Sequence, residues 1–393
     1  MKPVFAPGLN LGSARSETQR QISSIDDFRE TFQPHLEEFI DGKTESYANC
    51  IKDRQLVSIL NYPRKLAAQG KRIRPYVAFL MYSALSNEGA DNLDTNSKVM
   101  PMLVSLELFH LFCLVHDDII DRGTERHSLP TLQRMVASEL EVGNGLHNRD
   151  HIGNAQALLL GDILFAWAQE SFHANRNFDA ASHQTAQLYF NRMIDEVVLG
   201  EMLDVVMMTR LETSQESIEK KMLLKTAAYT FVRPMQLGAA LAGTGRQHEN
   251  YCSDLGCALG VAFQIQDDLL DIIGTPETTH KTLFADLRDH QHTYFTQYIF
   301  ERGSRLEKAQ LQRLLGADLK KADYATVLDL FESSGALRHG RERINRHFDQ
   351  ACLLVEDAPF RTMREPFHQL INDMRMRVPA CMSDIRLEHK LVA

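Results

Sequence analysis

The 393-residue sequence lacks several patterns that mark common classes of protein. Its six cysteines are scattered and include no CxxC pair, which excludes the usual zinc and dithiol motifs and favours reduced thiols in a cytoplasmic compartment. No apolar run is long enough to span a membrane, since the longest, Val99–Val115, is interrupted by Glu107 and His110. A net charge of −9 gives no indication of binding to nucleic acid or to an anionic membrane surface.

Sequence repeats, linker-like composition shifts and the glycine patterns of nucleotide-binding loops are also missing. We therefore expect one domain over residues 23–378. Residues 1–22 are polar and have no apolar core, so a disordered tail is favoured there over a transit peptide. A second tail is expected over residues 379–393.

Apolar residues recur with helical spacing almost everywhere, and no segment alternates convincingly with period two. This pattern predicts an all-α fold built from long packed helices. We expect helices over 25–51, over 56–85 with breaks at Pro63 and Gly70–Pro75, and over 155–174, 180–208, 215–245 and 254–273. The segment 124–154, rich in glycine and asparagine toward its end, predicts a long irregular loop.

One apolar helical run, Leu106–Asp121, ends in three carboxylates. Residues four apart lie above one another in a helix, so Asp117 and Asp121 share a face, and Asp118 lies about 100° round from Asp117. Carboxylates in so apolar a setting carry a large desolvation cost unless they are paired or bind metal. The run therefore predicts a binding site at its carboxyl end.

The same pattern returns at Asp267-Asp268-Leu269-Leu270-Asp271, again at the end of an apolar helix. Two solvated acidic helix ends are the plain structural alternative. Two clusters facing each other across a helix bundle are expected if cations lie between them. Carboxylate oxygens select a hard ion, and Mg²⁺ typically combines one or two carboxylates with phosphate oxygens and water. The clusters thus favour a polyphosphate ligand bridged by Mg²⁺.

Together these motifs resemble the two aspartate-rich motifs of trans-isoprenyl diphosphate synthases, of the short-chain farnesyl and geranylgeranyl type. The resemblance covers roughly residues 28–345, and its further pieces stand in family order. They are Gly70–Pro75, Gly161-Asp162, Lys225-Thr226 and Phe263-Gln264. It implies a single all-α helical bundle around a central cavity.

By this resemblance the six aspartates, Asp117, Asp118, Asp121, Asp267, Asp268 and Asp271, are metal ligands and hold about three Mg²⁺ ions against the diphosphate of an allylic substrate. The carbon–oxygen bond then ionises, and basic groups stabilise the leaving group. Arg126 and Lys225 are expected to take part in catalysis. The residues expected to bind the allylic diphosphate are Arg126, Lys225, Thr226, Phe263, Gln264 and Lys281.

The resemblance also implies a second substrate, isopentenyl diphosphate, bound without metal by Lys71, Arg74 and His110, with His127 nearby. A core histidine with one satisfied hydrogen bond is the alternative for His110. Attack of the isopentenyl double bond on the allylic cation extends the chain by five carbons, and the released pyrophosphate accepts the proton.

Three positions depart from the family pattern, and each lowers the positive charge around the phosphates. His127 replaces an arginine, Gln291 falls where a lysine is usual, and Glu201 replaces a glutamine. A histidine is often neutral near pH 7 and lacks the arginine fork, so use of isopentenyl diphosphate is in question. The alternatives are a weaker synthase, a terpene cyclase or lyase acting on an allylic diphosphate alone, and a regulatory subunit of a heteromeric synthase.

Lys71 and Arg74 favour the synthase, since a cyclase has no evident use for them. The segment 132–154 is longer than usual in the family, and its role is open. Phe112 and Cys113 lie five and four residues before Asp117, about one turn deeper along the growing tail. By resemblance an aromatic residue at Phe112 predicts a C20 product with some C15, while plain core packing is the alternative. Family members also predict a homodimer.

Overall fold

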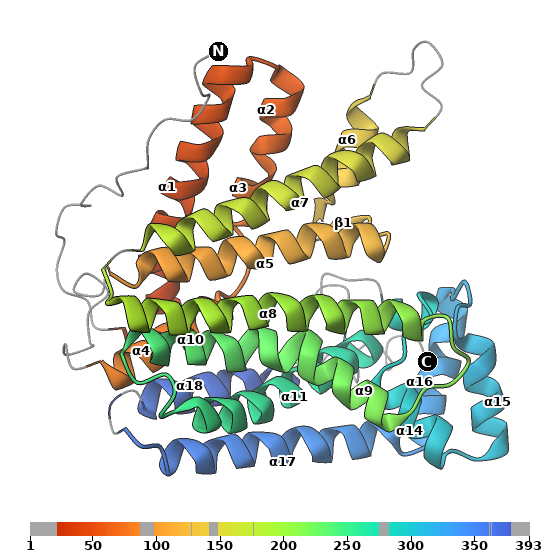
Figure 1. Cartoon of the computed structure of the whole chain (residues 1–393). Helices are drawn as coiled ribbons and strands as arrows, with labels where there is room; N and C mark the ends of the chain where they lie inside the picture. The colour runs from red at the N-terminus through yellow and green to blue at the C-terminus, as the bar shows by residue number, and fades with distance from the viewer. Residues whose placement is uncertain are drawn as a thin grey trace. The chain divides into compact units, whose positions relative to one another are not determined.

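The computed structural model describes residues 22–86, 98–126, 128–140, 148–175, 177–274, 283–360, 362 and 364–378. The chain divides into two compact units (Figure 1). The first comprises the described residues up to Phe79 and those from Ser86 to Ala180, and the second comprises 80–85 and the residues from 181 onward. The predicted single domain over 23–378, with its two tails, stays a prediction.

The first unit contains two long helices that run along each other, α5 (Met100–Ile120) and α7 (Arg149–Ala174), as Figure 1 shows. Around them lie α1 (Ile25–Ile51), α2 (Arg54–Leu60), α3 (Tyr62–Leu66), the start of α4 (Ile73–Leu85) and α6 (Leu132–Glu139). A two-residue hairpin follows α5, in which β1 (Glu125–Arg126) pairs antiparallel with β2 (Leu129–Pro130).

Helix α1 illustrates how local sequence sets these elements. Ser24 and Asp27 form a capping box, with Ser24 Oγ accepting from the Asp27 N–H at 3.1 Å. Phe28, Phe32 and Leu36 follow at four-residue spacing, and all three are fully buried. The cap fixes where the helix starts, and the apolar stripe fixes the face that it buries.

The second unit is built around α11 (Glu249–Ile273), which packs against the π-helix η1 (Met222–Val232) and against α17 (Ala336–Glu356). Its other elements are α8 (Ala180–Met207), α9 (Gln215–Lys221), α10 (Arg233–Leu241), α13 (Ala285–Arg288), α14 (Tyr294–Arg302), α15 (Arg305–Leu314), the 3₁₀ turn η2 (Lys321–Asp323), α16 (Tyr324–Ser333) and α18 (Arg364–Arg375). Helix α11 carries the second aspartate cluster at its carboxyl end.

Close backbone approach of η1 to α11 depends on glycine. A Cβ at Gly260 would lie 2.3 Å from the Cα of Ala227, and one at Gly256 would lie 2.8 Å from the Cα of Val232. Any side chain larger than hydrogen at either position would push η1 away from α11. The glycines thus fix how closely η1, which carries Lys225 and Thr226, approaches the aspartate helix.

The all-α prediction is confirmed. So are the helices over 25–51 and 180–208, which the structure places at Ile25–Ile51 and Ala180–Met207. The prediction of a long irregular loop over 124–154 was wrong in part, because α6 occupies 132–139 and α7 already begins at Arg149. Helix α6 buries Leu132, Val136 and Ala137. This short apolar face stabilises a helix in spite of the glycine and proline residues nearby, which favour a loop. None of the described helices is long and apolar enough to cross a bilayer.

Candidate active site

The first aspartate cluster lies at the carboxyl end of α5, as predicted. Asp121 is the C-cap and donates its N–H to the Asp117 carbonyl at 2.8 Å. Asp118 is 3% exposed, whereas Asp117 and Asp121 are half-buried. A turn through Arg122, at φ +53°, then leads away from the helix.

Arg126 from β1 reaches back to this cluster. Its Nε and Nη2 donate to Asp118 Oδ1 at 2.9 and 2.8 Å. Burial lowers the pKa of Arg126, but Asp118 and the flanking acids outweigh burial and hold the pKa above its ordinary value. The guanidinium therefore stays charged beside the aspartates. The metal role of Asp118 stays a prediction, and its Oδ1 serves Arg126 in this structure.

Two side chains that the sequence analysis missed hold this turn in place. The Tyr62 hydroxyl donates to the Pro130 carbonyl at 3.1 Å, and burial, with Asp118 next, raises the pKa of Tyr62 well above its usual range. The Gln133 amide donates to the Asp118 and Gly123 carbonyls at 2.7 and 3.0 Å. These three bonds join residues from different parts of the chain, so no local pattern in the sequence indicates them.

Arg72 anchors the basic turn that leads into α4, where Lys71 precedes the helix and Arg74 lies in its first turn. Lys71 is exposed and Arg74 half-buried, but Arg72 is buried and adopts φ +58°. Its Nη1 contacts Glu107 Oε1 at 2.8 Å, and its Nε donates to the Gln33 amide oxygen at 3.1 Å. This anchor was not predicted, although the lone glutamate inside an apolar run, Glu107, indicates a buried cationic partner.

His110, Phe112 and Cys113 are half-buried on α5. The Phe112 ring lies 5.4 Å from that of Phe165 on α7 and 4.6 Å from that of His116, measured between centroids. Phe112 is thus part of an aromatic contact between α5 and α7. The substrate role of His110 and the chain-length roles of Phe112 and Cys113 stay predictions.

The second cluster lies in the last two turns of α11, and its carboxylates already accept hydrogen bonds. Asp271 Oδ1 accepts from the N–H of Ala285 at 3.0 Å, at the start of α13. Asp268 accepts from the Gln264 amide at 2.7 Å and from the N–H of Tyr294 at 3.2 Å.

Asp268 and Asp267 differ in environment. Asp268 is 6% exposed, and burial raises its pKa to about 6 in spite of Lys221, Gln264 and the Tyr294 N–H, which lower it. Asp267 is more exposed and faces Arg377, whose Nη2 is 3.6 Å from its Oδ1. The Arg377 guanidinium also lies 4.8 Å from the ring centroid of Phe263. Arg377 is a further residue that the sequence analysis missed.

Two of the predicted substrate residues, Thr226 and Gln264, are joined to this cluster, and Lys225 precedes Thr226 on η1. The Thr226 hydroxyl donates to the Gln264 amide oxygen, and the same amide donates to Asp268. Lys225 Nζ contacts Glu201 Oε2 at 2.6 Å and Asp204 Oδ2 at 2.9 Å. Lys225 therefore lies between two carboxylates of α8 in this structure.

The departures from the family pattern are described only in part. Gln291 is half-buried, and the neighbouring His292 is buried, with its Nε2 2.9 Å from the Arg210 carbonyl. His127 and Lys281 lie outside the described residues, so their predicted roles in substrate binding stay predictions.

Across the described ranges, no group of three or more His, Cys, Asp or Glu side chains is arranged to hold a metal ion. The available donors are nevertheless carboxylate oxygens, which suit Mg²⁺. Because Mg²⁺ keeps several waters and commonly takes phosphate oxygens from its substrate, a complete protein cage is not required. The residues present fit Mg²⁺ that binds together with a diphosphate.

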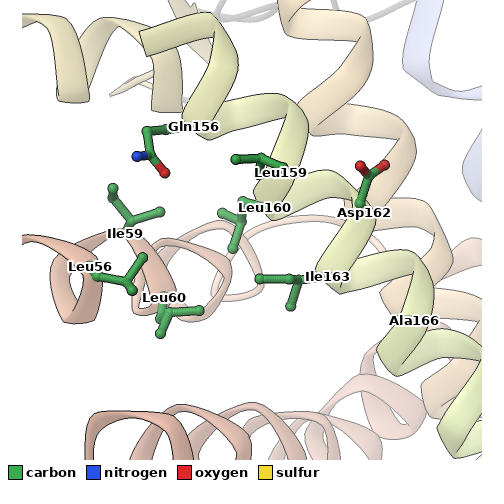
Figure 2. Close-up of a pocket in the computed structure, with 9 residues that line it drawn as sticks. All are labelled: Leu56, Ile59, Leu60, Gln156, Leu159, Leu160, Asp162, Ile163 and Ala166. Atoms are coloured by element: carbon green, nitrogen blue, oxygen red, sulfur yellow. The ribbon is translucent and has the colours of Figure 1, made fainter. Parts of the chain in front are cut away.

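A separate apolar pocket of about 410 Å³ lies between α2 and α7 in the first unit (Figure 2). Leu56, Ile59 and Leu60 from α2 face Leu160 and Ile163 from α7. None of the predicted substrate or metal residues lines it. Its lining offers few polar groups, so it does not provide a diphosphate site.

The chain is similar to known sequences over most of its length. The family model described as polyprenyl synthetase matches residues 55–331. The chain is 27% identical over 298 residues to the geranylfarnesyl diphosphate synthase of Aeropyrum pernix, covering 75% of this chain and 85% of that one. It is 30% identical over 318 residues to the (2E,6E)-farnesyl diphosphate synthase of Mycobacterium bovis, covering 77% and 79%.

Among solved structures, the chain is similar to a geranylgeranyl pyrophosphate synthase from Corynebacterium glutamicum complexed with isoprenyl diphosphate and magnesium. The TM-score is 0.83 at 26% sequence identity, and the match covers 90% of this chain and 99% of that one.

Proposed function

Because the chain belongs to the polyprenyl synthetase family and is a prenyltransferase, we propose that it condenses isopentenyl diphosphate with an allylic diphosphate into a short-chain all-trans prenyl diphosphate. The observation that carries the proposal is the position of the aspartates: each cluster stands at the carboxyl end of a long apolar helix, within the matched range. Lys71 and Arg74, on either side of the anchoring Arg72, support a second diphosphate substrate.

We propose that about three Mg²⁺ ions bind with the allylic diphosphate. The ligands would be drawn from Asp117, Asp118, Asp121, Asp267, Asp268 and Asp271. Bound there, Mg²⁺ would supply Lewis-acid stabilisation of the charge on the leaving group. Arg126 and Lys225 would donate hydrogen bonds to the same diphosphate, aided by Thr226 and Gln264.

The remaining steps follow from the chain's own residues. Lys71, Arg74 and His110 would hold the isopentenyl diphosphate while its double bond attacks the allylic carbon whose bond to oxygen has broken. The apolar α5 would exclude water from the carbocation. A proton then leaves the extended chain and passes to the released pyrophosphate, which balances the reaction.

One experiment tests the function. The purified protein is incubated with Mg²⁺, isopentenyl diphosphate and allylic diphosphates of C5, C10 or C15, and the products are identified by mass spectrometry. Elongated diphosphates are expected. Hydrocarbons or alcohols from an allylic substrate alone would instead identify a terpene cyclase or lyase, and activity only in the presence of a second protein would identify a regulatory subunit.

We also propose that Phe112 limits the product to C20, with some C15, and that Cys113 leaves room beside it. What supports this is that Phe112 lies more than a turn before Asp117 on α5, and its ring is held by Phe165 and His116. Phe112→Ala should lengthen the product by at least one five-carbon unit, because it removes the ring that is proposed to stop the growing tail. Phe165→Ala is the comparison variant on the opposing helix, and an unchanged distribution in Phe112→Ala would reject the assignment.

Finally, we propose a cytoplasmic homodimer. Cys252, Cys257 and Cys352 are free thiols, which suits a reducing compartment. The dimer is supported by a run of exposed apolar side chains on α8, which includes Leu199 and Met202.

A further inference from the structure

The pair of carboxylates around Lys225 is an unusual environment for a residue that binds an anion. Glu201 and Asp204 are three residues apart on α8 and therefore lie on one face of that helix. Lys225 Nζ lies 2.6 Å from Glu201 Oε2 and 2.9 Å from Asp204 Oδ2. Gly200 allows this approach, since a Cβ there would be 2.6 Å from the Lys225 backbone nitrogen.

Asp204 also has a cation besides Lys225. Lys221 Nζ donates to Asp204 Oδ1 at 2.9 Å and to the His292 carbonyl at 2.7 Å. The Lys221 and Asp204 side chains are 9% and 5% exposed, so this pair is shielded from water. The two lysines and two carboxylates sum to zero charge, and Glu201 supplies the negative charge that cancels Lys225.

The Glu201–Lys225 contact is short and partly buried, so a ligand of Lys225 has to compete with it. The two side chains are 16% and 24% exposed, so salt and water screen their attraction less than at an open surface. A diphosphate that binds Lys225 must draw the ammonium away from Glu201, or bind beside a carboxylate of like charge. Either outcome costs binding free energy.

We propose that Glu201 is a positioning residue that weakens the binding of the allylic diphosphate and of pyrophosphate by holding the Lys225 ammonium. The inference rests on the proposed function, because it takes Lys225 to contact the allylic diphosphate. Two ligands should be affected, the allylic substrate and the inorganic pyrophosphate released from it. Loose binding of pyrophosphate favours its release after each condensation.

The test replaces Glu201 by glutamine, which keeps the size of the side chain and removes its charge. Glu201→Ala is a second variant that removes the hydrogen bond as well. The matched control is Glu196→Gln on the same helix, whose carboxylate accepts from Arg233 Nε at 2.7 Å. Binding of inorganic pyrophosphate with excess Mg²⁺ is measured by calorimetry on the full chain, and KM is measured for each substrate.

Both Glu201 variants should bind pyrophosphate about tenfold tighter and show a KM for the allylic diphosphate about tenfold lower. KM for isopentenyl diphosphate should stay the same, and Glu196→Gln should change neither constant. Equal or weaker pyrophosphate binding by folded Glu201 variants, in an enzyme that does elongate allylic diphosphates, overturns the inference alone. Tighter pyrophosphate binding without any elongated product supports the inference and refutes the proposed condensation.

Discussion

Asp268, like Asp118, is an aspartate of the candidate site that is almost completely buried. Burial raises its pKa to about 6, although Lys221, Gln264 and the Tyr294 N–H oppose the rise. In the unfolded chain an aspartate has a pKa near ~3.9. Between these values the folded protein holds a proton that the unfolded chain has lost. The stability that protonated Asp268 contributes is therefore present at low pH and is lost as pH rises through about 6.

The direction of this pH dependence can be measured by comparing the wild type with Asp268→Asn, whose side chain does not titrate. Free energies of unfolding are compared at about pH 5 and pH 7.5 in EDTA, where no Mg²⁺ offsets the charge. The wild type should lose about 1–3 kcal/mol of its free energy of unfolding between the lower and the higher pH, and the variant should not show this loss. Parallel pH dependences of the two proteins would contradict the burial argument.

Asp204 supplies the control of opposite sign. Its burial would raise the pKa, but Lys221 and Lys225 together hold the pKa below the ordinary value. Its contribution to stability is therefore present above the unfolded pKa and is lost as pH falls through the lower folded value. Asp204→Asn should lose stability relative to the wild type at neutral pH, and that deficit should shrink in acid.

At the scale of elements, the basic turn before α4 depends on one buried ion pair. The Arg72 and Glu107 side chains are each 2% exposed, and their contact ties this turn to α5. Removing one partner of such a pair leaves an unpaired charge in the interior. Glu107→Gln should therefore cost about 3–5 kcal/mol of the free energy of unfolding.

Two further variants test whether the cost of Glu107→Gln comes from the unpaired buried charge. The double variant Arg72→Met, Glu107→Leu removes both charges and should cost much less than Glu107→Gln. Asp349→Asn breaks the exposed pair with Arg375, in which the side chains are 65% and 35% exposed, and should cost less than ~1 kcal/mol. Urea unfolding of the three variants measures these costs. Equal losses for Glu107→Gln and Asp349→Asn would show that burial does not govern the pair.

The sequence could predict features that depend on neighbouring residues, but not those that depend on distant partners. Asp117 and Asp121 were located correctly at a helix end because their four-residue spacing and the apolar run before them are local properties. Arg72 and Lys221 were missed because each acquires its role from partners 35 and 71 residues away, Glu107 and the His292 carbonyl. The π-helix was not predicted either, because its residues continue the helical apolar pattern of 215–245 without a break.

At the scale of the whole molecule, α8 carries a stripe of exposed apolar side chains. Glu201 and Asp204 of this helix meet η1, but Val198, Leu199, Met202 and Val206 are 42%, 55%, 60% and 48% exposed. Four apolar residues at helical spacing form a continuous stripe rather than isolated surface positions. Such a stripe is the expected core of an interface between two copies.

The double variant Leu199→Lys, Met202→Lys places two like charges in that stripe. If the stripe is the dimer interface, the wild type should be a dimer at micromolar concentration and the variant a monomer, because the charges would lose water without finding partners. Sedimentation equilibrium measures both masses. Leu306→Lys, at an apolar residue of α15 that is 77% exposed, is the control and should leave the dimer intact. A wild-type monomer, or a variant that dimerises as tightly as the wild type, would remove α8 from the assembly.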